Sequence, residues 1–288
     1  MNKIMIFGKN GQVGWELQRT LSLLGDVVAF DKEQADLGNR DQLAQLIRTH
    51  RPTLIVNAAA YTAVDQAEED ESNAMKINGT APGIIAEEAK KLGALCVHYS
   101  TDYVFDGASA HPYVETDLTA PMNAYGRSKR AGEEAMVSVG GRFLIFRTSW
   151  VYGSRGKNFL LTMRRLGKEK SELKIVHDQI GAPTWSRHIA EATLCTAGKS
   201  IKETPSGIYH LTAGGTTSWH GFAEKIFSHR SLNDPYSAPK LIPIDAESYP
   251  SRVKRPKNSV LSNSKLHRTF EITLPPWETG LQLCLAGL

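Results

Sequence analysis

The chain has 288 residues, of which 41% are hydrophobic and 22% are charged, as in ordinary globular proteins with a large apolar core. Its formal net charge of +4 comes without a polybasic run interleaved with aromatic residues, so nucleic acid is excluded as the expected partner. No apolar stretch is long enough to cross a bilayer, and we expect no membrane partner.

The three cysteines, Cys96, Cys195 and Cys284, lie far apart, are odd in number and lack C-x-x-C spacing. This pattern favours reduced thiols over disulfides or a zinc site. The residues near Met1 do not resemble a signal peptide, because the first apolar run passes directly into a glycine-rich turn. We therefore expect a cytoplasmic protein.

The first predicted elements are a strand, a glycine turn and a helix. An apolar run at 4–7 is followed by Gly8, Gly11 and Gly14, and then by helical spacing over 15–21. In dinucleotide-binding proteins such glycines allow a tight turn, close approach of the pyrophosphate, and packing of helix on strand. The spacing here is G-x-x-G-x-x-G rather than G-x-G-x-x-G, so a glycine-rich loop of some other α/β protein stays open as the alternative.

A second predicted strand, residues 27–30, ends in Asp31. A carboxylate in this place is suited to accept hydrogen bonds from the adenine-ribose hydroxyls of a dinucleotide. Lys9 and Lys32 are close to Asp31 in sequence, and their charges would offset its repulsion of a 2′-phosphate. We expect both NADH and NADPH to serve as cofactor.

Apolar runs and helical patterns alternate through the first half of the chain. Beyond the second strand, the predicted strands are 54–57, 96–100 and 143–147, and a helix is predicted at 87–92. This alternation predicts an α/β fold of the Rossmann type, a doubly wound parallel sheet covered by helices on both faces.

Three of these strands end in small or polar residues. Ligands of a parallel sheet bind at the carboxyl ends of its strands, so residues 57–60, 100–103 and 147–150 are expected to converge on one crevice. The small side chains of residues 58–60 would let the backbone lie against a cofactor.

The composition of the sequence changes after Trp150, where glycine and proline residues separate short predicted elements. We predict a dinucleotide-binding domain at 1–149 and a smaller, loop-rich lobe at 150–288 that binds substrate and closes the crevice. Some segments of the second part are expected to return to the cofactor domain.

Tyr125 and Lys129 are four residues apart on a predicted helix and therefore share one face. An ammonium group beside a phenol lowers the pKa of the phenol toward the working pH, which makes Tyr125 a proton donor for a carbonyl. The Thr101 hydroxyl, at the end of a different strand, would hydrogen-bond the same carbonyl oxygen. A Tyr-x-x-x-Lys spacing also occurs on amphipathic helices of many kinds, and the glycine turn is what favours hydride-transfer chemistry here.

Seven stretches together resemble the extended short-chain dehydrogenase/reductases and, within them, the dTDP-4-dehydrorhamnose reductases. They follow the order of that family and run over nearly the whole chain. The stretches are 7–14 (FGKNGQVG), 56–60 (VNAAA), 99–107 (YSTDYVFDG), 125–129 (YGRSK), 146–152 (FRTSWVY), 178–184 (DQIGAPT) and 255–259 (RPKNS).

The resemblance implies reduction of the 4-keto group of dTDP-4-dehydro-β-L-rhamnose to dTDP-β-L-rhamnose by NADH or NADPH, in deoxysugar (dTDP-rhamnose) biosynthesis. It implies that Tyr125 protonates the forming alkoxide, that Lys129 tunes this phenol and holds the nicotinamide ribose, and that Thr101 orients the carbonyl. It also implies a small-molecule sugar-nucleotide substrate that contacts Thr101, Asp102 and Trp150. The full set of predicted cofactor-binding residues is Gly8, Gly11, Gln12, Val13, Gly14, Asp31, Asp36, Leu37, Ala60, Tyr61, Thr62, Tyr99, Tyr125 and Lys129.

Purely structural roles stay open for some of these residues. Trp150 is also suited to a place in the core, and Tyr99 is an ordinary aromatic residue for a strand. A basic set near the C-terminus suits the diphosphate of the substrate and a solvated charged face equally well. This set is Arg252, Lys254, Arg255 and Lys257.

Other functions occur within the same superfamily. Sugar-nucleotide epimerases share the glycine turn and the Tyr–Lys pair, and they retain their cofactor tightly. Dehydratases resemble Thr-Asp-Glu where this chain has Thr101, Asp102 and Tyr103, and the missing second carboxylate counts against dehydration. A non-catalytic, NADP-binding regulatory subunit is the remaining alternative, because the β subunit of methionine adenosyltransferase resembles this reductase in fold. The intact Tyr125, Lys129 and Thr101 count against it.

We predict no metal site. Some reductases of this family are dimers with magnesium held by carboxylates at the subunit interface. The two corresponding stretches here, 185–188 and 284–288, lack acidic side chains, whereas magnesium requires hard oxygen ligands. The dense acidic run at 68–71 is predicted to be a solvated helix face. We therefore expect metal-independent catalysis, and we favour a monomer slightly over a homodimer.

Overall fold

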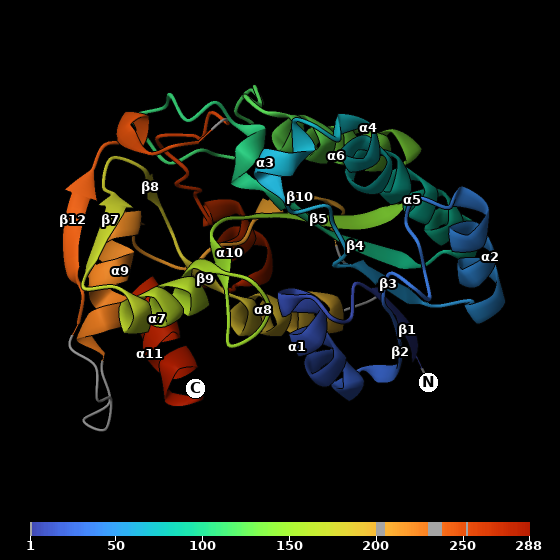
Figure 1. Cartoon of the computed structure of the whole chain (residues 1–288). Coiled ribbons are helices and arrows are strands. Elements are labelled where there is room, and N and C mark those ends of the chain that lie inside the picture. The colour runs from blue at the N-terminus through green and yellow to red at the C-terminus, as the bar shows by residue number, and fades with distance from the viewer. Residues whose placement is uncertain (1, 200–204, 230–237, 252) are drawn as a thin grey trace.

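The computed structural model describes residues 2–199, 205–229, 238–251 and 253–288. Its central sheet has six strands: β1 (Asn2–Phe7), β2 (Gly25–Phe30), β3 (Leu54–Asn57), β4 (Leu95–Thr101), β5 (Arg142–Thr148) and β10 (Gly207–His210). They pair in parallel in the order β10, β5, β4, β3, β1, β2 (Figure 1). The strand order reverses between β1 and β3, and this is where such sheets bind ligands. The predicted doubly wound parallel sheet is confirmed.

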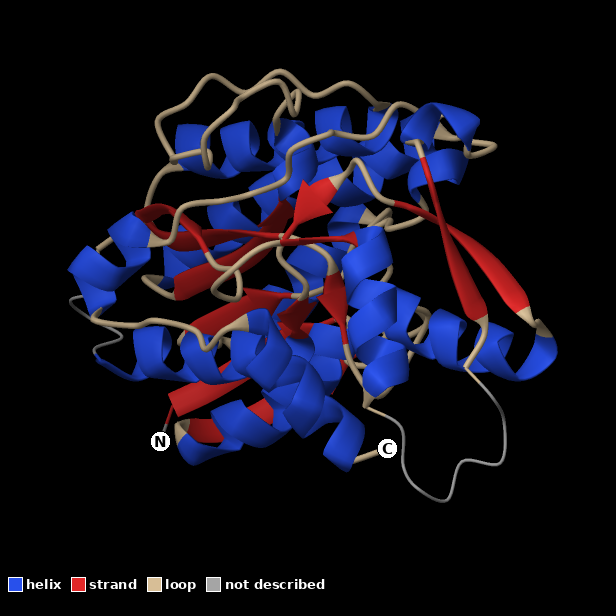
Figure 2. Ribbon diagram, turned by 90° about the vertical axis from the view of Figure 1, so that its left-hand side faces the viewer, coloured by secondary structure: helices blue, strands red, loops and turns tan. Residues whose placement is uncertain are grey.

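Helices cover both faces of the sheet (Figure 2). One face carries α1 (Gln12–Thr20), the short 3-10 helix η1 (Leu21–Leu23), α8 (Ser186–Lys199) and α10 (Ser264–Phe270). The other face carries α2 (Arg40–His50), α5 (Ala81–Leu92) and α6 (Ala124–Val139). Along β1, Ile4 and Ile6 point to the first layer while Met5 and Phe7 point to the second. Burial on both faces explains why this strand is a continuous apolar run in the sequence.

Short helices connect the strands of the first half. These are α3 (Val64–Ala67), α4 (Glu71–Ala74), the π-helix η2 (Met75–Thr80) and the 3-10 helix η3 (Asp102–Val104). The helix predicted at 87–92 is longer than expected: α5 begins at Ala81, directly after η2. Pro82 lies in the first turn of α5.

A second, smaller part of the structure follows Trp150. Its elements are β6 (Val151–Tyr152), α7 (Phe159–Glu169), β7 (Glu172–Val176), β8 (Ile180–Gly181), β9 (Thr184–Trp185), β11 (Thr217–Ser218), α9 (Trp219–Ser228), β12 (Lys240–Ile244), η4 (Ala246–Ser248) and α11 (Trp277–Ala286). The pair β7 and β12 stands apart from the central sheet (Figure 1). A separate apolar core, including Leu160, Phe222 and Trp277, holds α7, α9 and α11 together.

Segments from the second half of the chain complete the cofactor sheet. Strand β10 pairs with β5, with Gly207 opposite Leu144. Leu211 and Leu266 lie in the same apolar core as Ile4. The sheet therefore draws on residues from both ends of the chain, and the predicted division of binding tasks between 1–149 and 150–288 stays a prediction.

Candidate active site

The glycine turn connects β1 to α1 and lies against the loop after β3. Gly8 has a φ of +86°, and a Cβ atom at this position would lie 2.6 Å from the Ala59 nitrogen. A Cβ on Gly14 would lie 2.1 Å from the Gly8 carbonyl oxygen, so the first turn of α1 packs directly on the turn. Only glycine fits both places. The close backbone approach and the free N–H groups at the start of α1 suit a pyrophosphate.

A cavity of about 680 Å³ opens at this turn. Most of the predicted cofactor-binding residues line it, namely Gly8, Gly11, Gln12, Val13, Asp31, Asp36, Leu37, Ala60, Thr62, Tyr99, Tyr125 and Lys129. Gly14 is absent from the lining because it packs beneath the turn. Tyr61 is also absent; its backbone N–H donates to Asn78 Oδ1 at 2.8 Å. The size and chemistry of the cavity fit a nicotinamide dinucleotide.

Asp31 lines this cavity and is paired with a lysine. Lys9 Nζ is 3.1 Å from Asp31 Oδ2. The hydrogen bond from Lys9, together with one from the Gln34 backbone, lowers the pKa of the Asp31 carboxyl. Lys32 lines the same cavity. The Asp31 carboxylate is thus available to ribose hydroxyls, with positive charge close by.

We expect the protein to use NADH and NADPH with specificity constants that differ by less than about a hundredfold, or under roughly 3 kcal/mol. The physical reason is that Lys9 offsets the charge of Asp31, so a 2′-phosphate meets little net repulsion. Steady-state kcat/KM for each cofactor checks this. Asp31→Asn is the isosteric variant for comparison and should shift the ratio toward NADPH. A larger preference in the parent protein would show that one charge dominates.

Helix α6 carries Tyr125 and Lys129 and is tightly anchored at its start. The Asn123 side chain caps it by accepting from the Gly126 N–H at 2.8 Å. Glu68 Oε1 accepts from the Ala124 N–H at 2.6 Å. The run at 68–71 is exposed, as predicted, but it is not one helix face: it spans the break between α3 and α4, and Glu71 pairs with Arg127 on α6 at 2.9 Å.

Tyr125 lies beside η3. Its ring makes an edge contact with the Tyr103 ring, with centroids 5.6 Å apart. Burial raises the pKa of Tyr125 to about 12, the charge of Asp102 adds to this, and a hydrogen bond with Thr101 acts in the opposite direction. The expectation that Lys129 lowers this pKa is wrong for the structure as described. The cause is that the Lys129 ammonium is bonded elsewhere.

Lys129 is only 2% exposed. Its Nζ donates to the Tyr99 carbonyl oxygen at 2.5 Å and lies 3.2 Å from His98 Nε2. Burial lowers the pKa of Lys129 to about 8, while the charge of Glu133 acts in the opposite direction. Lys129 shares the cavity with Tyr125, as predicted from the spacing, and its head group points toward β4.

Thr101 and Asp102 are buried next to Tyr125. The Thr101 hydroxyl donates to Asp102 Oδ1 at 2.9 Å and accepts from the Tyr103 N–H at 3.2 Å. Burial raises the pKa of Asp102 to about 6. Neither residue lines the dinucleotide cavity or the larger cavity described below.

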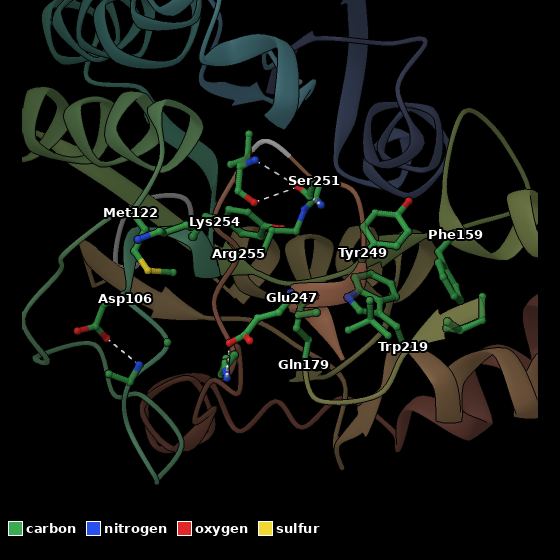
Figure 3. A pocket seen from close by; sticks show the side chains of 18 of the residues that line it. Asp106, Met122, Phe159, Gln179, Trp219, Glu247, Tyr249, Ser251, Lys254 and Arg255 are labelled. Atoms are coloured by element: carbon green, nitrogen blue, oxygen red, sulfur yellow. Dashed lines mark hydrogen bonds and ion pairs between the residues drawn. The ribbon is translucent and has the colours of Figure 1, made fainter. Parts of the chain in front are cut away.

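A second cavity, of about 870 Å³, lies between η3 and the smaller lobe (Figure 3). Figure 3 shows Arg255 and Ser251 joined by a hydrogen bond on one side of it, and Trp219 and Phe159 on another. Arg255 also pairs with Asp65 at 2.8 Å. Lys254 and Lys257 line the cavity too, whereas Arg252 lies outside the described residues.

Trp150 was predicted to contact the substrate, and the structure places it in an aromatic stack. Its ring lies 3.6 Å from the Trp219 ring at an interplanar angle of 7°. Its φ of +48° is in the left-handed region, which costs free energy for a large side chain. A Cβ on Gly181 would lie 2.5 Å from the Trp150 ring. Trp219 lines the larger cavity and Trp150 supports it from behind.

Several cavity residues were missed by sequence reasoning. Ser100 and Thr148 are not among them: both belong to the strand ends expected to converge on one crevice, and both line the dinucleotide cavity, although the predicted cofactor-binding set did not name them. Ile77 comes from the π-helix, and Lys157 from a loop after β6. In the larger cavity, Trp219 belongs to a helix that carried no motif, and only the tertiary structure brings it to the site.

Within the described ranges, no helix combines the length and apolar character that a membrane span requires. The same part of the chain holds no group of three or more His, Cys, Asp or Glu side chains placed to bind a metal ion. Metal independence nevertheless stays a prediction.

A parallel sheet with a glycine turn, a dinucleotide-sized cavity and a Tyr–Lys pair inside it defines a Rossmann-type, nicotinamide-dependent oxidoreductase. The family model described as RmlD substrate binding domain matches residues 1–288. A dTDP-4-dehydrorhamnose reductase of Burkholderia thailandensis is 50% identical, over 99% of this chain and 99% of that protein. The chain belongs to the dTDP-4-dehydrorhamnose reductase family.

Two further relatives support this assignment. A dTDP-4-dehydrorhamnose reductase of Escherichia coli is 44% identical over 99% of this chain and 97% of that protein. The crystal structure of a dTDP-4-dehydrorhamnose reductase from Bacillus anthracis in complex with NADP superimposes with a TM-score of 0.91 at 37% identity. It covers 100% of this chain and 99% of that one.

Proposed function

We propose that this protein reduces the 4-keto group of dTDP-4-dehydro-β-L-rhamnose to dTDP-β-L-rhamnose with NADPH or NADH. One observation carries the proposal: Tyr125 lines the dinucleotide cavity, Tyr103 lines the larger cavity, and their rings are in contact. The proton donor therefore lies where the two cavities meet. A cofactor in one and a sugar nucleotide in the other would meet at this pair.

The residues of the chain divide the work by position. The glycine turn and Asp31 hold the dinucleotide at its pyrophosphate and adenine ribose, and Lys129 holds it at the nicotinamide end. When bound, the dihydronicotinamide supplies the hydride. The Tyr125 hydroxyl gives its proton to the carbonyl oxygen as that oxygen gains charge, and the Thr101 hydroxyl hydrogen-bonds the same oxygen. Asp102 and the stacked rings of Trp150 and Trp219 border the sugar.

The raised pKa of Tyr125 is consistent with this role. A phenol with a pKa of about 12 holds its proton at neutral pH and can donate it only as the carbonyl oxygen becomes basic. A positive charge brought close to the phenol would stabilise the phenolate that remains. Lys129 is the buried cation on the same helix face.

The test is an NADPH-oxidation assay with a panel of 4-keto sugar nucleotides. The proposal expects turnover with dTDP-4-dehydro-β-L-rhamnose and a lower kcat/KM for keto sugars of other configuration or base. Cofactor that stays bound through purification, with interconversion of sugar epimers and no net oxidation, would instead indicate the epimerase. Cofactor binding without any turnover would indicate the regulatory subunit.

The proposed oligomeric state is a monomer, and catalysis is proposed to need no divalent metal. Arg187 lies in the stretch 185–188, which has no carboxylate of its own, and its guanidinium pairs with Glu16 of α1 at 3.3 Å and offsets the charge of that carboxylate. EDTA is expected to leave activity unchanged. Size-exclusion chromatography with and without magnesium checks the oligomeric state. Dimerisation that depends on added magnesium would contradict both proposals.

The cytoplasmic location also stays a prediction. It rests on the reduced state expected of the cysteines. Cys96, Cys195 and Cys284 are all free in the structure, and Cys96 and Cys284 are buried. These features are those of a protein that functions with reduced thiols.

A further inference from the structure

A line of buried polar side chains leads from the sheet to Lys129. Asn57 ends β3 and stands directly opposite His98 of β4 in the parallel register. Asn57 Nδ2 is 3.2 Å from His98 Nδ1, and Lys129 Nζ is 3.2 Å from His98 Nε2. Asn57 and His98 are each 1% exposed. Nothing in the hydride-transfer chemistry described above uses Asn57 or His98.

The direction of these hydrogen bonds is determined at the Asn57 end. Asn57 Oδ1 accepts from the Ala59 N–H at 3.2 Å, so the NH₂ group of the same amide faces His98. His98 Nδ1 must then be an acceptor. Burial and the charge of Lys129 lower the pKa of His98 well below its ordinary value, so the ring is neutral. A neutral imidazole with an accepting Nδ1 carries its proton on Nε2.

The Nε2–H therefore points at the Lys129 nitrogen. An ammonium group has three donors and no lone pair, so it cannot accept from His98. A neutral amine can accept. This contact stabilises the amine, whereas the Tyr99 carbonyl, at 2.5 Å, accepts a hydrogen bond from Lys129 in either state.

Other charged groups face Lys129 from its own helix and from the neighbouring strand. Glu133, one turn further along α6, favours the ammonium, but it pairs with Arg147 of β5 at 2.7 Å. Asp102 lies at the Tyr125 end of the site. Burial outweighs the effect of Glu133 and leaves the pKa of Lys129 at about 8.

We propose that Asn57 and His98 are positioning residues that control whether Lys129 carries a proton. The Ala59 backbone orients Asn57, Asn57 selects the tautomer of His98, and His98 favours the amine form of Lys129. The proposal deepens the proposed function, because it rests on Lys129 as the cation that stabilises the Tyr125 phenolate. The ammonium is present below the pKa of Lys129 and lost above it. Asn57 and His98 therefore set the pH at which kcat/KM falls on the alkaline side.

The decisive variant is Asn57→Asp. A carboxylate can accept from both the Ala59 N–H and the His98 ring, which moves the imidazole proton to Nδ1. His98 Nε2 then offers a lone pair to Lys129 and stabilises the ammonium. The added charge also acts directly on Lys129 through space, so the same change is made in a His98→Leu background, where no tautomer can respond. His98→Met is a second apolar background in case the leucine variant does not fold.

The first readout needs no turnover. In protein with isotope-labelled lysine and histidine, NMR follows the titration of Lys129, assigned with Lys129→Arg, and reports the tautomer of His98. We expect the Nε2–H tautomer in the parent and the Nδ1–H tautomer in Asn57→Asp. The titration midpoint of Lys129 should rise by about one pH unit or more. Most of this rise should be absent in the His98→Leu background.

The second readout is the pH profile of kcat/KM, whose alkaline limb should move up by the same amount in Asn57→Asp. An equal rise in both backgrounds, or an Nδ1–H tautomer in the parent, would overturn the inference. Failure of the parent to reduce any keto sugar would refute the proposed function while leaving the NMR result standing. The two failures are therefore distinguishable.

Discussion

Tyr125→Phe is expected to lower turnover by about two to four orders of magnitude, the usual scale for loss of a general acid. The ring contact with Tyr103 is kept in this variant, because phenylalanine retains the ring and loses only the hydroxyl. Cofactor affinity should change little. Single-turnover NADPH oxidation measures the loss of turnover, and quenching of protein fluorescence by added cofactor measures the cofactor affinity.

The matched control for this variant is Tyr209→Phe. The Tyr209 hydroxyl donates to the Pro205 carbonyl oxygen at 3.2 Å, its ring makes an edge contact with Phe270, and Tyr209 and Pro205 line neither cavity. The same chemical change should leave turnover close to that of the parent. Near-parental turnover in folded Tyr125→Phe would remove Tyr125 from the proposed role.

Glu133→Leu is expected to destabilise the fold by about 3–5 kcal/mol, because it leaves the Arg147 guanidinium buried without its counter-charge. The pair is bidentate, with N–O distances of 2.9 and 2.7 Å, and each side chain is 4% exposed. It connects α6 to β5 directly behind the Tyr125–Lys129 face. Urea unfolding followed by circular dichroism measures the loss.

The double variant Glu133→Leu with Arg147→Met separates charge from packing. Replacing both partners by apolar side chains of similar volume is often close to neutral, so it should recover most of the lost stability. If the single and double variants are equally destabilised, the loss comes from packing and the buried charge is not its cause.

The parts of the site that the sequence predicted are those set by local chemistry. Gly8 and Gly14 are recognisable because a turn between a strand and a helix needs glycine within a few residues of the apolar run. Asp31 and Thr101 followed from one further rule, that parallel strands deliver their carboxyl ends to one edge, whereas Tyr99 came only from the family resemblance. The spacing of Tyr125 and Lys129 correctly placed both in one cavity.

The parts that could not be predicted depend on contacts between distant residues. The stack of Trp150 on Trp219 joins two segments with no shared pattern, and the left-handed backbone of Trp150 has no signal in its sequence. The sign of the pKa shift of Tyr125 was wrong because spacing gives the face of a helix and not the partner of a lysine head group. That partner, the Tyr99 carbonyl with His98 beside it, is known only once β4 is placed under α6.

The return of the chain to its first sheet has a consequence for biosynthesis. Strand β10 and helices α8 and α10 are needed to cover β5 and the α1 face, yet they lie after residue 185 and leave the ribosome well after β1 to β5. Until then the nascent chain exposes the edge of β5 and one apolar face of the sheet. Chaperones bind such surfaces, and such surfaces promote aggregation. We therefore expect the nucleotide-binding half to complete its folding only after α10 has left the ribosome, and prematurely terminated chains ending near residue 149 to be cleared by proteases.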